Sequence, residues 1–142
     1  PASRRIMTNL YNFEDLSEMH LYPCAYSMTF NVSGNRLNAI LNQRSQDMLT
    51  ANNWNVCQYA ALLTMFAKAS GFEPGELVHV IADAHIYDRH VDAVKRLIEK
   101  KPYPAPEMQV EDITDFYKFT KNSFTAVDYK YHEFTDKIPV AI

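Results

Sequence analysis

The chain of 142 residues is long enough for one domain with a hydrophobic core, and its 47% hydrophobic and 22% charged residues are typical of a globular protein. A formal charge of −3 provides no broad basic field, which argues against bulk nucleic-acid binding. No apolar run is long enough to span a bilayer and no signal peptide opens the sequence, so we expect a cytoplasmic protein in which Cys24 and Cys57 are reduced thiols.

The first part of the chain is predicted to form strands. A short apolar–polar stretch at residues 5–10 indicates a strand, and an acidic turn capped by Asn12 follows it. From residue 26 apolar and polar side chains alternate, and after the turn triplet at residues 33–35 a second run extends over residues 36–45. The two runs predict a β-hairpin. The apolar face of its first arm is expected to consist of Tyr26, Met28, Phe30 and Val32.

The middle of the chain predicts a helix followed by a strand. Residues 55–70 have helical periodicity, and Gly71 stands where a left-handed residue ends a helix. Apolar side chains also occupy the neighbouring faces, so we expect this helix to be buried nearly all round, with Cys57 as a packing residue. The continuous apolar run at residues 77–82 predicts an internal strand.

A second helix is predicted over residues 89–100, capped by Asp88, with an exposed ion pair between Asp92 and Arg96. Strands and helices together predict one α/β domain of the α+β type over residues 1–142, in which helices pack on one face of a mixed β-sheet. Two helices cover only one side of such a sheet. The other side is therefore expected to pack against a second copy, in a sheet-to-sheet homodimer.

Cys24 is the candidate nucleophile. It lies between Pro23, which fixes its own φ, and the start of a strand, and such a rigid position suits a nucleophile. The competing interpretation of a lone cysteine is a small buried hydrophobe. In the simplest hairpin register Arg44 lies near the level of Cys24, where a guanidinium favours the thiolate. Arg44 and Ser45 can also grip a phosphate, although a surface position is the simpler interpretation of Arg44 alone.

A second candidate site follows the apolar strand. His85 and Tyr87 point to the same side of an extended segment at the carboxyl end of that strand, where ligands of α/β sheets tend to bind. Two neutral hydrogen-bonding groups suit a sugar hydroxyl, and a structural histidine is an equally good interpretation. The other histidines, including His79, show no metal-ligand spacing and are assigned to structure or surface, so no metal is expected. With three glycines in the chain, a glycine-rich phosphate loop is excluded.

Taken jointly, six short motifs resemble thymidylate synthase in order and spacing. They are Ser3-Arg4-Arg5-Ile6, Pro23-Cys24, Gln43-Arg44-Ser45-x-Asp47, Asn55-Val56-x-x-Tyr59, Asp83-Ala84-His85-Ile86-Tyr87 and Pro139-Val140-Ala141-Ile142. The resemblance covers essentially the whole chain but corresponds to the C-terminal half of the family's length. We therefore expect a fragment that has little activity alone. The missing half is expected to hold a folate-side glutamate and further folate contacts.

The resemblance implies an enzyme that converts dUMP to dTMP. Cys24 would attack C6 of the uracil ring, and 5,10-methylenetetrahydrofolate would supply the methylene group and the hydride, leaving dihydrofolate. The implied dUMP-binding residues are Gln43, Arg44, Ser45, Asp47, Asn55, His85 and Tyr87, together with Arg4 and Arg5 acting across a homodimer. The implied folate-binding residues are Asp47, Ala141 and Ile142.

Two departures and three rivals qualify this interpretation. Ala25 stands where many members of the family have histidine, and the loop at residues 51–54 lacks the usual glycine, which affects water contacts and folate contacts.

The nearest rival is a pyrimidine-nucleotide hydroxymethylase, against which Asn55 argues, because an amide matches the N3–H and O4 of uracil. A non-catalytic nucleotide-binding protein of the same fold is the second rival. A Cys-His hydrolase, the third, lacks a recognisable histidine motif.

Overall fold

The computed structural model describes residues 3–140, which divide into two compact units, Pro1–His85 and Ile86–Ile142. The first unit contains β1 (Met7–Asn9), η1 (Leu16–Glu18), β2 (Ala25–Ser33), β3 (Arg36–Gln43), β4 (Gln46–Asp47), α1 (Asn52–Ala69), β5 (Glu73–Ile81) and β6 (Ala84–His85). The second contains η2 (Asp88–His90), α2 (Val91–Ile98), β7 (Glu107–Val110), η3 (Phe116–Lys118), η4 (Lys121–Ser123) and β8 (Phe124–Val127). Within residues 3–140, no helix has the length and apolar character needed to cross a membrane.

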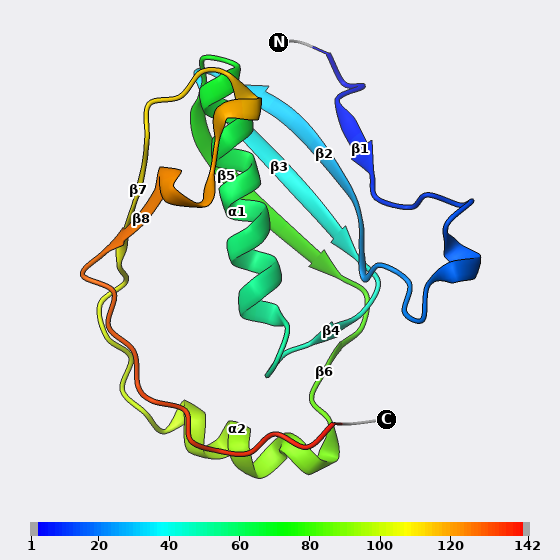
Figure 1. The fold of residues 1–142 in the computed structure, drawn as a ribbon, viewed down its shortest axis with the longest axis vertical. Helices are drawn as coiled ribbons and strands as arrows, with labels where there is room; N and C mark the ends of the chain where they lie inside the picture. The colour runs from blue at the N-terminus through cyan, green and yellow to red at the C-terminus, as the bar shows by residue number, and fades with distance from the viewer. Residues whose placement is uncertain (1–2, 141–142) are drawn as a thin grey trace. The chain divides into compact units, whose positions relative to one another are not determined.

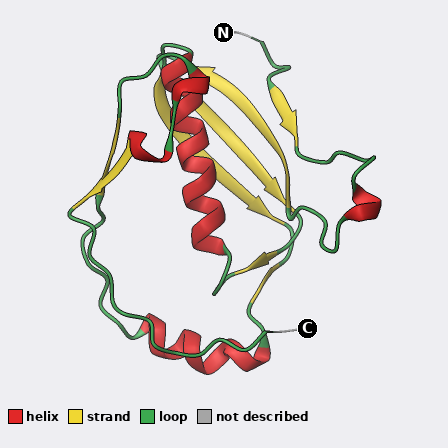
Figure 2. Ribbon diagram, in the orientation of Figure 1, coloured by secondary structure: helices red, strands yellow, loops and turns green. Residues whose placement is uncertain are grey.

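The first unit is a mixed sheet with one long helix against it (Figure 1; Figure 2). The strand order is β1-β2-β3-β5, in which the first three strands are antiparallel and β5 runs parallel to β3. The predicted hairpin is confirmed: Ser33 pairs with Arg36, and Gly34 turns the chain with a φ of +60°. Glycine adopts this left-handed conformation without the steric cost that other residues incur.

The core of this unit lies between the hairpin and α1. Met28 and Leu41 are completely buried, and they pack with Tyr59, Leu63 and Ala67, which recur every four residues along the helix. Phe30 adds an edge-to-face contact with Phe66, with ring centroids 5.3 Å apart. Gly71 ends the helix as predicted, with a φ of +72° and with Phe72 N–H bonded to the Ala67 carbonyl.

The prediction of all-round burial for the first helix is wrong. The helix starts three residues earlier than expected, at Asn52, and buries one face only, so that Cys57 and Trp54 stand exposed. Apolar side chains on every face permit burial on every side but do not specify what covers each side. Cys57 is therefore not a packing residue within the described part of the chain.

Two strand predictions also need correction. β5 pairs with β3 alone and lies at the edge of the described sheet, with Val78 and Val80 each 48% exposed. A continuous apolar run shows that both faces of a strand are apolar, not that both edges are paired. In β2 a bulge between Ala25 and Ser27 shifts the alternation, so that Ala25 is buried and Tyr26 is exposed instead of lining the core.

Gly75 is required by the close approach of β5 to β3. A Cβ atom at this position would lie 2.8 Å from the Leu37 carbonyl oxygen and 2.1 Å from Oδ1 of Asn38, which accepts the Glu76 N–H. We expect Gly75→Ala to lower the free energy of unfolding by about 1–3 kcal/mol, because the backbone must move apart to make room. Urea unfolding measures this change. Glu76→Ala, at the next and exposed residue, is the control, and equal stability of the two variants would contradict the steric argument.

In the second unit the C-terminal segment runs along α2. Nε2 of His90 lies 2.9 Å from the Pro139 carbonyl oxygen, and Arg96 forms an ion pair with Asp136 at 2.8 Å. This hydrogen bond raises the pKa of Arg96. This carboxylate, distant in sequence, replaces Asp92 as the main partner of Arg96, while the charge of Asp92 also raises the pKa of Arg96. Strands β7 and β8 form an antiparallel pair that the sequence pattern did not indicate.

Candidate functional site

Cys24 lies in the bend immediately before β2 and is partly exposed. Ala25 pairs with Gln43, and the next residue, Arg44, donates its backbone N–H to the Cys24 carbonyl at 2.9 Å. The expected level position of Cys24 and Arg44 is thereby confirmed. The end of the hairpin holds the backbone on both sides of the thiol.

The Arg44 side chain also holds this bend. Its Nε donates to the Pro23 carbonyl at 3.1 Å and its Nη2 donates to the Tyr22 carbonyl at 2.7 Å. Tyr11 adds a third constraint, because its hydroxyl donates to the same Pro23 carbonyl at 3.1 Å. A guanidinium has five N–H groups and these bonds use two of them, so the cation can still bind an anion.

A shallow pocket opens beside this cation. It has a volume of about 420 Å³ and is lined by Tyr11, His20, Leu21, Tyr22 and Arg44. Hydroxyl, imidazole and guanidinium groups are the side chains that bind anionic oxygens. Side chains suited to an anion therefore line this pocket, which is built from residues that precede Cys24 and from the residue that follows β3.

Two distant sequence blocks meet in the short parallel pair β4–β6. Asp47 pairs with His85, and the Gln46 N–H donates to the Asp83 carbonyl at 2.9 Å. The Asp47 carboxylate accepts the N–H groups of Leu49 at 2.9 Å and of Thr50 at 3.2 Å, as well as the Thr50 hydroxyl. Asp47 thus shapes the loop that leads into α1 and stands beside the candidate hydroxyl-binding histidine.

Asn55 is held by a buried glutamine. Its Nδ2 donates at 3.1 Å to Oε1 of Gln43, and Nε2 of His79 lies 2.9 Å from the same oxygen. Burial lowers the pKa of His79, which keeps this ring neutral at pH 7. Gln43 pairs with Ala25 across the hairpin, and Ala25 follows Cys24 in the chain. Gln43 therefore links the strand that begins after the thiol to the side-chain amide of Asn55.

The other predicted site residues are not brought together here. Arg4 and Arg5 are exposed ahead of β1, and Tyr87 belongs to the second unit. Ala141 and Ile142 lie outside the described residues. No cluster of three or more His, Cys, Asp or Glu side chains suited to a metal ion occurs within residues 3–140.

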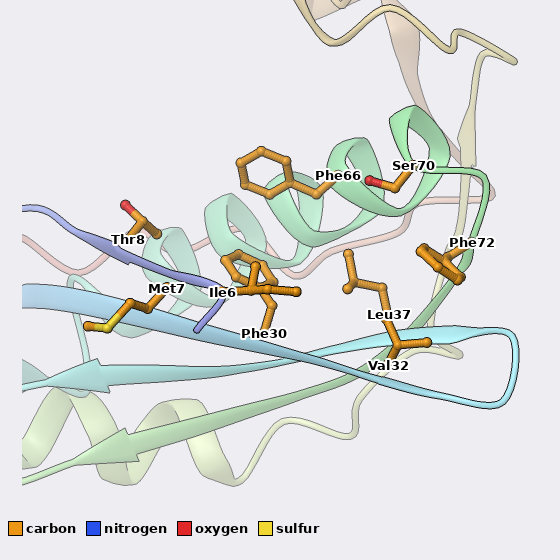
Figure 3. A pocket seen from close by; sticks show the side chains of 9 residues that line it. All are labelled: Ile6, Met7, Thr8, Phe30, Val32, Leu37, Phe66, Ser70 and Phe72. Atoms are coloured by element: carbon orange, nitrogen blue, oxygen red, sulfur yellow. The ribbon is translucent and has the colours of Figure 1, made fainter. Parts of the chain in front are cut away.

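A second, slightly smaller pocket in the first unit is apolar. It has a volume of about 370 Å³, and Figure 3 shows its lining side chains, which come from β1, the hairpin and the end of α1. Phe30, Leu37 and Phe66 dominate it, and its polar lining side chains are the hydroxyls of Thr8 and Ser70. It contains neither a nucleophile nor an ionisable group, so the candidate site is at Cys24.

Sequence reasoning missed three residues of this site. The sequence prediction gave no site role to Tyr11 or Gln46 and assigned His79 to structure or surface, yet Tyr11 holds the Cys24 bend and the other two contact Gln43. His79 is the lone polar side chain in an otherwise apolar run, and Gln46 is 1% exposed. A polar residue inside an apolar strand is the signal that could have identified His79, because burial requires a hydrogen-bond partner.

Comparisons with known proteins agree on one family. The family model described as thymidylate synthase matches residues 1–142. Thymidylate synthase of Bacillus phage phi3T is 39% identical over 132 residues, and that of Bacillus licheniformis is 40% identical over 132 residues; each alignment covers 92% of this chain and 47% of the relative. The solved structure of thermostable thymidylate synthase A from Bacillus subtilis superposes with a TM-score of 0.89 and 37% identity, over all of this chain and 50% of that one. The chain thus spans about half the length of these relatives.

Proposed function

The chain belongs to the thymidylate synthase family, and we propose that it takes part in the methylation of dUMP to dTMP. The observation that carries the proposal is the hairpin end, where the Cys24 backbone pairs with Arg44 and the adjoining Gln43 holds Asn55. The proposed nucleophile and the cation lie at the end of one pair of strands, and the proposed base-reading amide, on α1, is hydrogen-bonded to the same strand end. These are the three groups that addition to a uracil nucleotide requires.

In the proposed reaction the Cys24 thiolate adds to C6 of dUMP. The sulfur–carbon bond forms while the C5–C6 double-bond electrons move toward C5 and O4, which makes C5 nucleophilic. Bound 5,10-methylenetetrahydrofolate supplies the one-carbon group and the hydride. Loss of the C5 proton and release of the thiolate complete dTMP formation. The role of the protein is to hold the thiol, the charge on O4 and the phosphate in fixed relative positions.

The proposed binding roles are those that the resemblance to the family implies. We propose that Arg44 and Ser45 hold the phosphate, Asn55 reads the uracil edge, and His85 with Tyr87 binds the 3′-hydroxyl. Arg44 supports this role through the N–H groups left free by its two carbonyl contacts. The folate-side contacts are assigned to Asp47, Ala141 and Ile142, and Gln43 and Asp47 complete the nucleotide-binding residues.

We also propose a symmetric homodimer in which Arg4 and Arg5 reach the phosphate site of the other subunit. In the first unit α1 packs on one face of the sheet, and Ile40, Val78 and Val80 stand exposed on the other. Burial of an exposed apolar patch on a sheet face is favourable, and packing against the same face of a second copy gives a two-fold interface. Arg4 and Arg5 are exposed and would gain an anionic partner there.

The choice of base tests the proposed substrate. We expect the protein to bind dUMP more tightly than dCMP, and Asn55→Asp to shift this preference toward dCMP by about 1–3 kcal/mol, because a carboxylate accepts from the amino group of cytosine but repels O4 of uracil. Competition binding with both nucleotides measures the shift. Asn53→Asp, which makes the same chemical change at an exposed position of α1, should leave the preference unaltered. A preference that Asn55→Asp does not move would exclude this residue from base recognition.

A further inference from the structure

The Gln43 side chain is only 2% exposed, and all its hydrogen-bonding positions are occupied. Its Nε2 donates to the Ser45 carbonyl at 2.8 Å and to Oε1 of Gln46. Its Oε1 accepts from Asn55 and contacts Nε2 of His79. A primary amide offers two N–H groups and two lone pairs, so none is left for a ligand. Gln43 therefore acts on a bound nucleotide through its neighbours.

One backbone atom fixes the direction of every bond in this network. An amide turned over by 180° exchanges its donor and acceptor ends while keeping its shape. The Ser45 carbonyl can only accept a hydrogen bond, so the nitrogen end of Gln43 must face it. The oxygen end then faces Asn55, which must present an N–H to it. Asn55 keeps its oxygen and its second N–H for a ligand.

His79 adds a hydrogen bond to this orientation. Its ring is neutral at pH 7, because burial lowers its pKa, and a neutral imidazole has a single N–H. That N–H must be on Nε2, since this nitrogen faces Oε1 of Gln43 at 2.9 Å. If Gln43 were turned over, this N–H would oppose an N–H of the amide in a partly buried place, unless the imidazole proton moved to Nδ1. With its proton on Nε2, His79 thus favours the observed orientation of Gln43, and with it the observed orientation of Asn55.

We propose that His79 is a positioning residue for pyrimidine recognition, acting through Gln43 to hold the Asn55 amide in the orientation that reads uracil. Uracil presents a donor at N3 and an acceptor at O4, whereas cytosine presents an acceptor at N3 and a donor at its amino group. For a base bound to Asn55 in one fixed pose, one orientation of the amide matches uracil and the reversed one matches cytosine, and we assign the observed orientation to uracil. The Asn55 amide could recognise either base. The hydrogen bonds from the Ser45 carbonyl through Gln43 hold it in the orientation that we assign to uracil. The inference rests on the proposed function, because it needs a pyrimidine nucleotide at Asn55.

The test is the ratio of dissociation constants for dUMP and dCMP in His79→Phe, which removes the N–H and keeps a planar ring. We expect the preference for dUMP to fall by about three- to tenfold, the effect of one neutral hydrogen bond. Damage to packing alone would weaken the binding of dUMP and of dCMP equally, and the ratio of their dissociation constants would stay unchanged. His79→Gln, whose amide can donate again, should restore much of the ratio. His132→Phe, which makes the same change at an exposed histidine with no proposed role in the site, is the matched control.

A second measurement does not depend on any variant. The ¹⁵N shifts of the His79 ring in the unaltered protein report its tautomer, and we expect the proton on Nε2; a proton on Nδ1 would overturn the inference. The binding outcomes are also distinguishable. If the unaltered protein prefers dUMP and His79→Phe retains the same ratio, the role of His79 is wrong while the proposed function stands. If the unaltered protein binds neither nucleotide, the proposed function fails and the inference fails with it.

Discussion

Replacement of the thiol in Cys24→Ser is expected to reduce exchange of the C5 proton of dUMP with solvent deuterium by more than about a thousandfold, as is typical when one member of a catalytic unit is removed. Addition of the thiolate to C6 makes C5 carbanionic, so C5 takes up a deuteron from D₂O. Loss of the original proton and departure of the thiolate then return labelled dUMP. A serine hydroxyl is almost entirely protonated at pH 7 and is a much weaker nucleophile.

Proton NMR of dUMP in D₂O follows this exchange directly. The readout needs the nucleotide alone, so it isolates the first chemical step from the later transfer of the one-carbon group. The dissociation constant of dUMP should change little in Cys24→Ser, since the side chain is nearly isosteric. Cys57→Ser is the control, because this second thiol is exposed on α1 and should leave exchange intact. Exchange that persists in Cys24→Ser at the parent rate would exclude Cys24 as the nucleophile.

The local features of the site follow from the sequence because they depend on periodicity and turn chemistry. The alternating pattern and the glycine-containing turn determine the hairpin register from Ser33 and Arg36 to Ser27 and Asn42, and the bulge before Ser27 then brings Arg44 opposite Cys24. The same reasoning identified Gly71 as the end of α1. Such predictions use neighbours in sequence or partners across one turn, where few alternatives compete.

The features that the sequence did not predict depend on partners far apart in the chain. His79 reads as an isolated polar residue until β5 lies beside β3 and brings it to Gln43. The Arg96 partner is Asp136, 40 residues away, in place of the expected carboxylate one helical turn away. An i,i+4 pair contributes only about 0.2–0.5 kcal/mol, so a well-placed distant carboxylate readily replaces it. Burial on all sides of α1 failed as a prediction for a similar reason, because composition does not specify a partner.

Arg44 carries the second large expected effect, because the structure gives its guanidinium two tasks. As a cation it would bind the phosphate of dUMP, and as a planar fork it holds the Tyr22 and Pro23 carbonyls ahead of the thiol. Lysine retains the charge but not the fork, and alanine retains neither. We expect Arg44→Ala to weaken dUMP binding and to slow C5 exchange at saturating dUMP by about 10- to 100-fold, the range for losing a hydrogen bond to a charged group.

Arg44→Lys separates the two tasks. Its ammonium group can still attract the phosphate, so the dissociation constant of dUMP should stay within a few fold of the parent value. It cannot reproduce two parallel N–H contacts to adjacent carbonyls, so the bend at Cys24 should loosen and the exchange rate at saturation should fall nearly as far as in Arg44→Ala. Arg36→Ala, at the exposed start of the same strand, removes an arginine without touching the bend and should alter neither quantity. If Arg44→Lys instead weakens dUMP binding and leaves the saturated rate at the parent value, the fork does not position the thiol, and Arg44 serves the phosphate alone.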